Sequence, residues 1–169
     1  MTKTFLFLVL TALLFTSCKE EEDTIPQSEL AGTYEISNEI NATGIWMVNQ
    51  YIFAADRTME QIGLMRDSEK GGVLGYVYYT RGSYSIRGFN LVISMTEAYT
   101  LNYQANPKGY AETIEELKAA TLSAEFVDFN GRVIRAAAGT KTSIALVCSE
   151  IIGPTPTNCV GERVFYRVD

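Results

Sequence analysis

The sequence predicts an all-β protein, most simply an antiparallel up-and-down β-barrel of about eight to ten strands with one short helix; a β-sandwich is the alternative. Two observations lead to this prediction. Short runs in which apolar and polar residues alternate recur from residue 30 to the C-terminus, and this period of two is typical of strands. Turn-forming residues separate the runs at short intervals, so neighbouring strands are expected to pair as hairpins.

The expected strands follow one another closely along the chain. They cover residues 30–36, 45–54, 58–65, 73–80, 83–87, 91–96, 122–129, 132–138, 142–148 and 161–168. Residues 45–54 are apolar on both faces, as in a strand that is covered on two sides or lines a pocket. Asp56-Arg57 and Gly88-Phe89-Asn90 predict hairpin turns, and Gly82 predicts a break between two strands.

Two further local signals concern the second half of the chain. Asn130-Gly131 is the strongest hairpin signal in the sequence, because both residues accept the positive φ of a tight turn. Residues 111–120 combine strong helix formers with apolar residues at helical spacing, so we expect the short helix there, on the outside of a sheet.

The first 17 residues have the features of a secretory signal peptide. Lys3 supplies a positive charge, and residues 5–15 form an almost wholly apolar run that is shorter than the ~20 residues of a membrane-spanning helix. Thr16 and Ser17 lead directly into Cys18, a pattern that resembles the lipobox of bacterial lipoproteins. The resemblance implies that residues 1–17 are removed and that Cys18 carries acyl chains such as palmitate, which anchor the protein to a membrane.

An acidic segment follows this cysteine. Residues 20–23 are four consecutive acids after Lys19, and they resemble the export signal of surface lipoproteins in Bacteroidetes-type bacteria. We therefore expect residues 18–29 to form a lipidated N-terminus and linker, and the protein to lie on the outer membrane facing outward. Attachment facing the periplasm is the alternative, and a solvated, extended tether fits the same charges. Asp23-Thr24-Ile25 also resembles a short O-glycosylation acceptor of such bacteria.

The composition argues against several functional classes. The 169-residue chain has a net charge of −6 and no histidine. It thus lacks the basic surface of a nucleic-acid-binding protein, the commonest general base and the commonest transition-metal ligand. No phosphate-binding loop, zinc motif or nucleophile motif is present. We expect a protein that is not an enzyme and has no cofactor, metal or nucleic-acid partner; carboxylate catalysis is the remaining enzymatic alternative.

The cysteines fit an oxidising compartment. If Cys18 carries lipid, Cys148 and Cys159 remain as an even pair, and a disulfide between them is the simplest expectation. Such a bond would raise the free energy of unfolding by about 3 kcal/mol in the chain-entropy model, because it restricts the unfolded chain. A thiol metal site or a nucleophilic cysteine is the alternative.

Short motifs at the start of the predicted domain resemble lipocalin-like domains. Leu30-Ala31-Gly32-Thr33-Tyr34 resembles their Gly-x-Trp start, with tyrosine in place of tryptophan. Residues 53–58 and 82–91 resemble the strand-and-turn layout of small lipocalin-like lipoproteins of Bacteroidetes. The resemblance covers most of residues 30–169 and implies one lipocalin-like β-barrel domain there. It also implies that Arg167 packs against Tyr34, as an arginine near the last strand does against the lipocalin tryptophan.

Aromatic residues supply the candidate binding site. Tyrosine and tryptophan can stack on sugar rings or line an apolar pocket while their polar groups form hydrogen bonds. We expect a cavity for a small apolar or amphipathic ligand or a glycan, lined by Trp46, Tyr51, Phe53, Tyr76 and Tyr78. The alternative is a structural or interaction module of a surface complex, in which the same aromatic residues fill the barrel.

Overall fold

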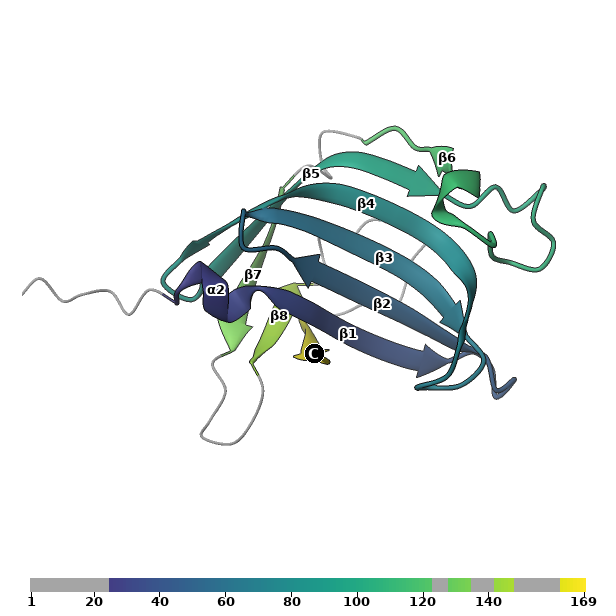
Figure 1. Cartoon of the computed structure of the whole chain (residues 1–169), viewed down its shortest axis with the longest axis horizontal. Helices are drawn as coiled ribbons and strands as arrows, with labels where there is room; N and C mark the ends of the chain where they lie inside the picture. The colour runs from purple at the N-terminus through teal and green to yellow at the C-terminus, as the bar shows by residue number, and fades with distance from the viewer. Residues whose placement is uncertain (1–24, 123–127, 135–141, 148–161) are drawn as a thin grey trace, which may run out of the picture.

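The computed structural model describes residues 25–122, 128–134, 142–147 and 162–169, and within these ranges eight antiparallel strands form a closed barrel (Figure 1). The barrel strands are β1 (Gly32–Glu39), β2 (Trp46–Phe53), β3 (Thr58–Arg66), β4 (Val73–Arg87), β5 (Asn90–Thr100), β7 (Asp128–Ile134), β8 (Ser143–Val147) and β9 (Glu162–Arg167). The two-residue strand β6 (Lys118–Ala119) pairs with β5, and α2 (Gln27–Leu30) and the 3₁₀ turn η1 (Ile114–Glu116) complete the described elements. No helix among them is long and apolar enough to cross a membrane.

The strands follow an up-and-down order. Each barrel strand pairs with the next barrel strand along the chain, and β1 pairs with β9 to close the sheet on itself. This confirms the barrel rather than the β-sandwich, because a sandwich consists of two separate sheets. The turns expected at Asp56-Arg57 and Gly88-Phe89-Asn90 are also confirmed. Arg57 has a φ of 73° and Gly88 a φ of 59°, as tight hairpin turns require.

Two glycines expected at turns or breaks lie inside continuous strands instead. The predicted hairpin at Asn130-Gly131 is wrong, because β7 runs through both residues and Gly131 pairs with Leu91 and Leu146. A Cβ atom at Gly131 would lie 2.7 Å from the carbonyl oxygen of Ala145, so this glycine permits close approach of two strands. Gly82 bends β4 without ending it, and the register against β5 shifts beside it.

The helix expected within residues 111–120 is present only as the short 3₁₀ turn η1 (Ile114–Glu116). Apart from the turn η1, this segment pairs with the barrel: Ala111 bridges to Tyr76 of β4, and β6 extends β5. Helix propensity is a preference of at most ~1 kcal/mol per residue for these residue types. Pairing with exposed strand edges satisfies the backbone of the segment equally well and buries Ala111 and Leu117 against Val77.

A short helix occurs instead at the N-terminal side of the barrel. Ile25 is 4% exposed and Leu30 is fully buried, and both belong to the same core as the barrel interior. The expected linker over residues 18–29 therefore reaches the barrel at Ile25, and α2 packs beneath it (Figure 1). We call this end of the barrel the closed end, and the opposite end, with the β1–β2 and β3–β4 loops, the open end.

Aromatic rings fill the interior at the closed end. We call this cluster the aromatic floor; its members are Tyr34, Tyr51, Phe53, Tyr84 and Phe165. Tyr51 and Phe165 meet edge to face with 4.9 Å between ring centroids, and Phe53 and Tyr84 do so at 5.0 Å, an arrangement that aromatic pairs favour. The hydroxyls of Tyr34 and Tyr84 donate to backbone carbonyl oxygens. The floor is thus densely packed and its buried polar atoms are satisfied.

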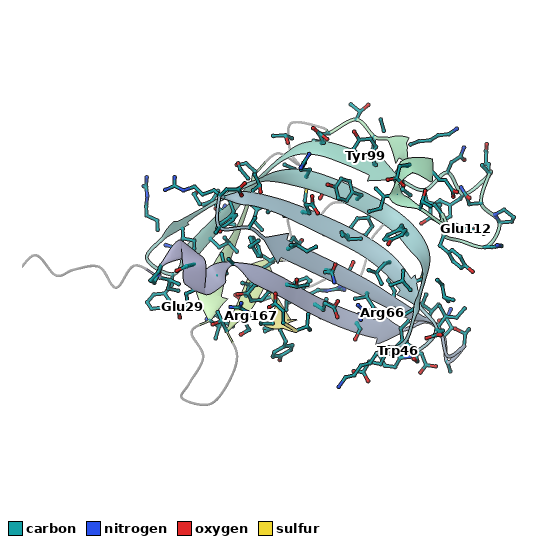
Figure 2. The ribbon with its side chains drawn as sticks, viewed as in Figure 1. Glu29, Trp46, Arg66, Tyr99, Glu112 and Arg167 are labelled. Atoms are coloured by element: carbon teal, nitrogen blue, oxygen red, sulfur yellow. The ribbon has the colours of Figure 1, made fainter. Side chains whose placement is uncertain are left out.

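Side chains reinforce the contact that closes the barrel. β1 and β9 share two register pairs, one of which joins Tyr34 to Arg167 as the sequence resemblance implied. Arg167 Nη1 donates to the carbonyl oxygen of Glu29 at 3.1 Å, and Nε donates to Asp169 Oδ1 at 2.8 Å (Figure 2). Asp169 Oδ2 accepts the backbone N–H of Thr33 at 2.9 Å. These bonds tie the last strand to both β1 and α2.

The carboxyl of Asp169 makes this closure depend on pH. Burial alone would raise its pKa, but the hydrogen bonds from Arg167 and from the Thr33 N–H outweigh burial and hold the pKa below the ordinary value of 3.8. A carboxyl whose pKa is lowered by folding stabilises the folded state above its unfolded pKa, and this stabilisation is lost as the pH falls through the lowered value. We therefore expect Asp169→Asn to lower the free energy of unfolding at pH 7 and to flatten its decline below about pH 4.

Urea unfolding at pH 7 and at about pH 3 measures both effects. Glu69→Gln, which removes an exposed carboxylate at the open end, is the matched control and should behave as the wild type does. An unchanged pH slope in Asp169→Asn would show that this carboxylate does not contribute to closure.

Candidate functional site

The candidate site is a layer of polar side chains inside the barrel, immediately above the aromatic floor. Because side chains alternate between the two faces of a strand, Asn49 points inward with Tyr51 on β2, and Arg163 points inward with Phe165 on β9. Both lie two residues, or about 7 Å, nearer the open end than the contact between Tyr51 and Phe165. We call the layer the polar layer; its members are Asn49, Gln61, Tyr78, Thr80 and Arg163.

Four of these side chains form a directed chain of hydrogen bonds. Thr80 Oγ1 donates to Gln61 Oε1 at 3.3 Å, and Gln61 Nε2 donates to the Tyr78 hydroxyl oxygen at 3.3 Å. The Tyr78 hydroxyl in turn donates to Asn49 Oδ1. The chain uses the acceptor oxygen of Asn49 and leaves its Nδ2 group able to donate into the barrel interior.

A glycine makes this arrangement possible. Gly63 lies on β3 between its register partners Asn49 on β2 and Tyr78 on β4. A Cβ atom at Gly63 would lie 2.2 Å from the ring of Tyr78, so the ring covers the space that a side chain would occupy. Tyr78 therefore crosses β3 and reaches the strand beyond it.

Part of the polar layer is less deeply buried than the aromatic floor. Asn49, Tyr78 and Arg163 are partly exposed although they point inward, whereas Tyr51 and Phe53 in the floor are 1% and 2% exposed. Burial raises the pKa of Tyr78 well above its ordinary value of 10, while the hydrogen bond from Gln61 and the positive charge of Arg163 act in the opposite direction. The hydroxyl of Tyr78 thus stays protonated at neutral pH.

The charge in this layer is positive. Arg163 brings a guanidinium inside, and no Asp or Glu occupies an inward-facing position on the strands that the structure describes. Among the described residues, no carboxylate lies within ion-pair distance of Arg163. The guanidinium of Arg163 and the Nδ2 group of Asn49 together give the layer more hydrogen-bond donors than acceptors.

Three of the five aromatic residues expected to line a cavity do face the interior. Tyr51 and Phe53 are in the aromatic floor, where their rings stack 6.2 Å apart, and Tyr78 is in the polar layer. The floor residues pack against other core residues, so Tyr78 is the member of the expected set that is placed to contact a ligand.

Trp46 and Tyr76 lie on the outer face of the wall, and this corrects the expected set. Trp46, the first residue of β2, lies on the same outward face as Val48 (Figure 2). Tyr76 packs on Val48 and Leu64 outside the barrel, because the register of β4 shifts where it pairs with Leu64. The five aromatic residues therefore do not line one cavity.

Side chains from the neighbouring strands cover part of the outer face of β2. Arg66 on β3 reaches across β2 to Glu35 on β1, with Nη1–Oε2 and Nη2–Oε1 distances of 3.0 and 2.7 Å. Gln50 donates to the same carboxylate at 2.6 Å. Val48 is fully buried although it points outward, and Trp46, Gln50 and Ile52 on the same face are partly buried, so the outer face of β2 is partly covered.

The sequence interpretation missed Asn49, Gln61 and Thr80. Asn49 interrupts the inward series of Met47, Tyr51 and Phe53, and Gln61 follows Met59 in the inward series of β3. A polar residue within an otherwise apolar series is a detectable signal. It could not be used without knowing which face of each strand points inward.

Cys18, Cys148 and Cys159 lie outside the described residues, so lipid attachment and the disulfide stay predictions. In the part of the chain that the structure describes, no group of three or more Cys, Asp or Glu residues could hold a metal ion.

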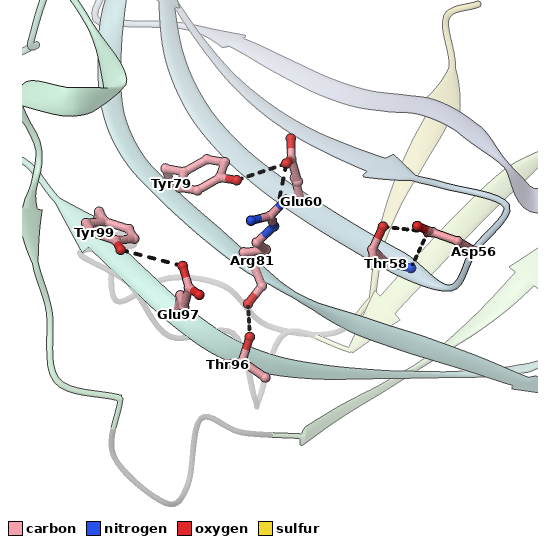
Figure 3. Close-up of polar contacts among 8 residues, drawn as sticks. All are labelled: Asp56, Thr58, Glu60, Tyr79, Arg81, Thr96, Glu97 and Tyr99. Carbon is pink, nitrogen blue, oxygen red and sulfur yellow. Dashed lines mark hydrogen bonds and ion pairs between the residues drawn. The ribbon is translucent and has the colours of Figure 1, made fainter.

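A hollow of about 260 Å³ lies on the outer wall between β4, β5 and η1. It is lined by Tyr79, Arg81, Glu97, Tyr99, Ile114, Glu115 and Leu117. Figure 3 shows that several of its polar groups are paired locally: Tyr79 donates to Glu60 at 2.9 Å, and Arg81 lies 4.0 Å from that carboxylate. Burial and Glu60 raise the pKa of Tyr79 to about 12. The barrel interior, where donors remain available, is therefore the better candidate.

The barrel and its interior contacts are what define the site. Comparisons with protein-family models, with curated proteins and with solved structures find no match for this chain. The closed antiparallel barrel rests on the pairing of its own strands, whereas membership of a lipocalin-like family stays an expectation from short motifs.

Removing one hydroxyl tests whether the polar layer is formed as described. Tyr78→Phe deletes the bonds to Asn49 and Gln61, and we expect it to lower the free energy of unfolding by about 1–2 kcal/mol. Tyr166→Phe, at a position that is 64% exposed, is the control and should change it by less than about 0.5 kcal/mol. Chemical denaturation of both variants measures the difference; equal stabilities would argue against the network.

Proposed function

We propose that this protein is a lipid-anchored protein of the bacterial outer membrane that binds a small amphipathic molecule inside its barrel and catalyses no reaction. The observation that carries the proposal is the contrast between the two halves of the interior. The half next to α2 is filled by aromatic rings. In the polar layer above it, Asn49, Tyr78 and Arg163 are partly exposed, and donor groups of Asn49 and Arg163 have no partner among the described residues. Binding proteins commonly combine apolar walls with a few such polar groups.

The chemistry of the layer favours binding over catalysis. A general acid and base would need titratable groups that converge on one substrate position. The polar layer instead contains two amides, two hydroxyls and one guanidinium, and the pKa of Tyr78 is raised away from neutrality. These groups orient and hold a ligand rather than exchange protons with it.

The proposed anchor determines how the barrel would stand on the membrane. Cys18 is seven residues before Ile25, which enters the core at the closed end, and seven extended residues span at most about 25 Å. With lipid on Cys18, the closed end would lie toward the bilayer and the open end away from it. A ligand could then reach the polar layer from the aqueous side.

Energy transfer tests this orientation. A donor dye is attached to the lipidated protein in vesicles at Ala55→Cys, in the β2–β3 turn of the closed end, or at Ser68→Cys, in the β3–β4 loop of the open end. With an acceptor on the lipid head groups, we expect higher transfer from position 55. Equal transfer from both positions would contradict a fixed approach through the closed end, and Cys18→Ser should abolish transfer from both.

Native mass spectrometry tests the binding function. The mature chain, residues 18–169 with Cys18→Ser, is purified from the periplasm of its own host, and we expect a bound molecule of a few hundred daltons. Asn49→Leu should reduce its occupancy, because it removes a polar contact inside the barrel. Gln50→Leu, the adjacent outward-facing position, is the matched control. A spectrum without bound molecules in the wild type would count against the proposal.

The second candidate function is an interaction module with a filled barrel. The observation that favours it is apolar exposure at the open end, where Ile45, Val73 and Tyr103 are 36%, 50% and 54% exposed. A protein partner could cover these side chains. In the same experiment, an empty barrel in the wild type, together with a host protein that is lost on Val73→Ser, would support this candidate instead.

A further inference from the structure

The charge inside the barrel has the opposite sign to the charge of the whole chain. The protein has a net charge of −6, yet the inward positions of the described strands hold no Asp or Glu, and Arg163 lies in the polar layer. A partly buried guanidinium that has no carboxylate partner among the described residues is unfavourable. A ligand that supplies the missing negative charge would remove this cost.

The hydrogen-bonding capacity of the layer points to the same kind of ligand. The hydrogen-bond chain from Thr80 through Gln61 and Tyr78 ends at Asn49 Oδ1, which accepts from the Tyr78 hydroxyl. The Nδ2 group of Asn49 is therefore left to donate to a ligand. Arg163 adds the planar fork of a guanidinium, which matches the two oxygens of a carboxylate. A group with several acceptors and no donors fits both residues.

The residues above and below the polar layer determine how such a ligand would lie. Below it, the contact between Tyr51 and Phe165 blocks further entry. Above it, Met47 and Met65 face each other in register on β2 and β3, point inward and are partly buried against the cluster that contains Val77, Leu101 and Ala111. Methionine side chains adapt readily to a flexible apolar chain.

We propose that the ligand is an amphipathic carboxylate whose head group binds Arg163 and the Nδ2 group of Asn49, and whose apolar chain extends past Met47 and Met65 toward the open end. This inference rests on the proposed binding function. It adds the charge of the ligand and its direction: the head group is deep in the barrel and the chain points outward.

Calorimetric titration tests the inference with a matched pair of probes. Dodecanoate and 1-dodecanol, which share the same alkyl chain, are titrated into residues 18–169 carrying Cys18→Ser. We expect dodecanoate to bind about tenfold or more tightly than the alcohol, because a hydrogen bond to a charged group contributes that much. Arg163→Gln should abolish this preference and leave the alcohol unaffected, whereas Arg163→Lys should retain part of it.

Arg87→Gln removes an exposed arginine at the β4–β5 turn and is the control for net charge; it should retain the full preference. Circular dichroism verifies that each variant remains folded. Equal affinity for acid and alcohol, or a preference that survives Arg163→Gln, would overturn the inference and leave the binding function standing. Failure of both probes to bind would contradict the binding function itself. Tighter binding of dodecyl phosphate than of dodecanoate would overturn the assignment to a carboxylate.

Discussion

The closure of the barrel between its first and last strands is the constraint on which the rest of the structure depends. β1 and β9 meet through few backbone pairs, and Arg167 joins the last strand to Asp169 and to the Glu29 carbonyl. Because a closed sheet has no free edges, every barrel strand acquires one inner and one outer face. The separation of core, polar layer and surface follows from that closure.

Closure also explains why the two halves of the interior can differ. At the closed end, α2 and the turns supply a cover, so large rings can pack there without contact with water. Toward the open end the same strands carry Asn49, Gln61 and Tyr78, which satisfy one another across three strands. A buried polar group is tolerated when it has partners, and the absence of a side chain at Gly63 allows these partners to meet.

Much of the architecture could be predicted from local patterns, because hairpins bring together residues that are close in sequence. Two sorts of local pattern predicted elements of the fold correctly. These are the alternation in residues 30–36 and 45–54 and the turns at Asp56-Arg57 and Gly88-Phe89-Asn90. The errors have a common cause. Asn130-Gly131 and residues 111–120 carry strong local preferences, but contacts with distant strands outweigh them.

The sequence by itself determined the all-β class, the pairing of most neighbouring strands and the expectation of an exported, lipid-anchored chain, since periodicity, turn residues and the segment before Cys18 are local features. Only the tertiary structure decided which aromatic residues share a face. A register shift beside Leu64 turns Tyr76 outward while Tyr78 stays inside, and closure brings Arg163, more than a hundred residues after Asn49 in the chain, into the same layer. Such proximity depends on register and closure, which no local pattern encodes.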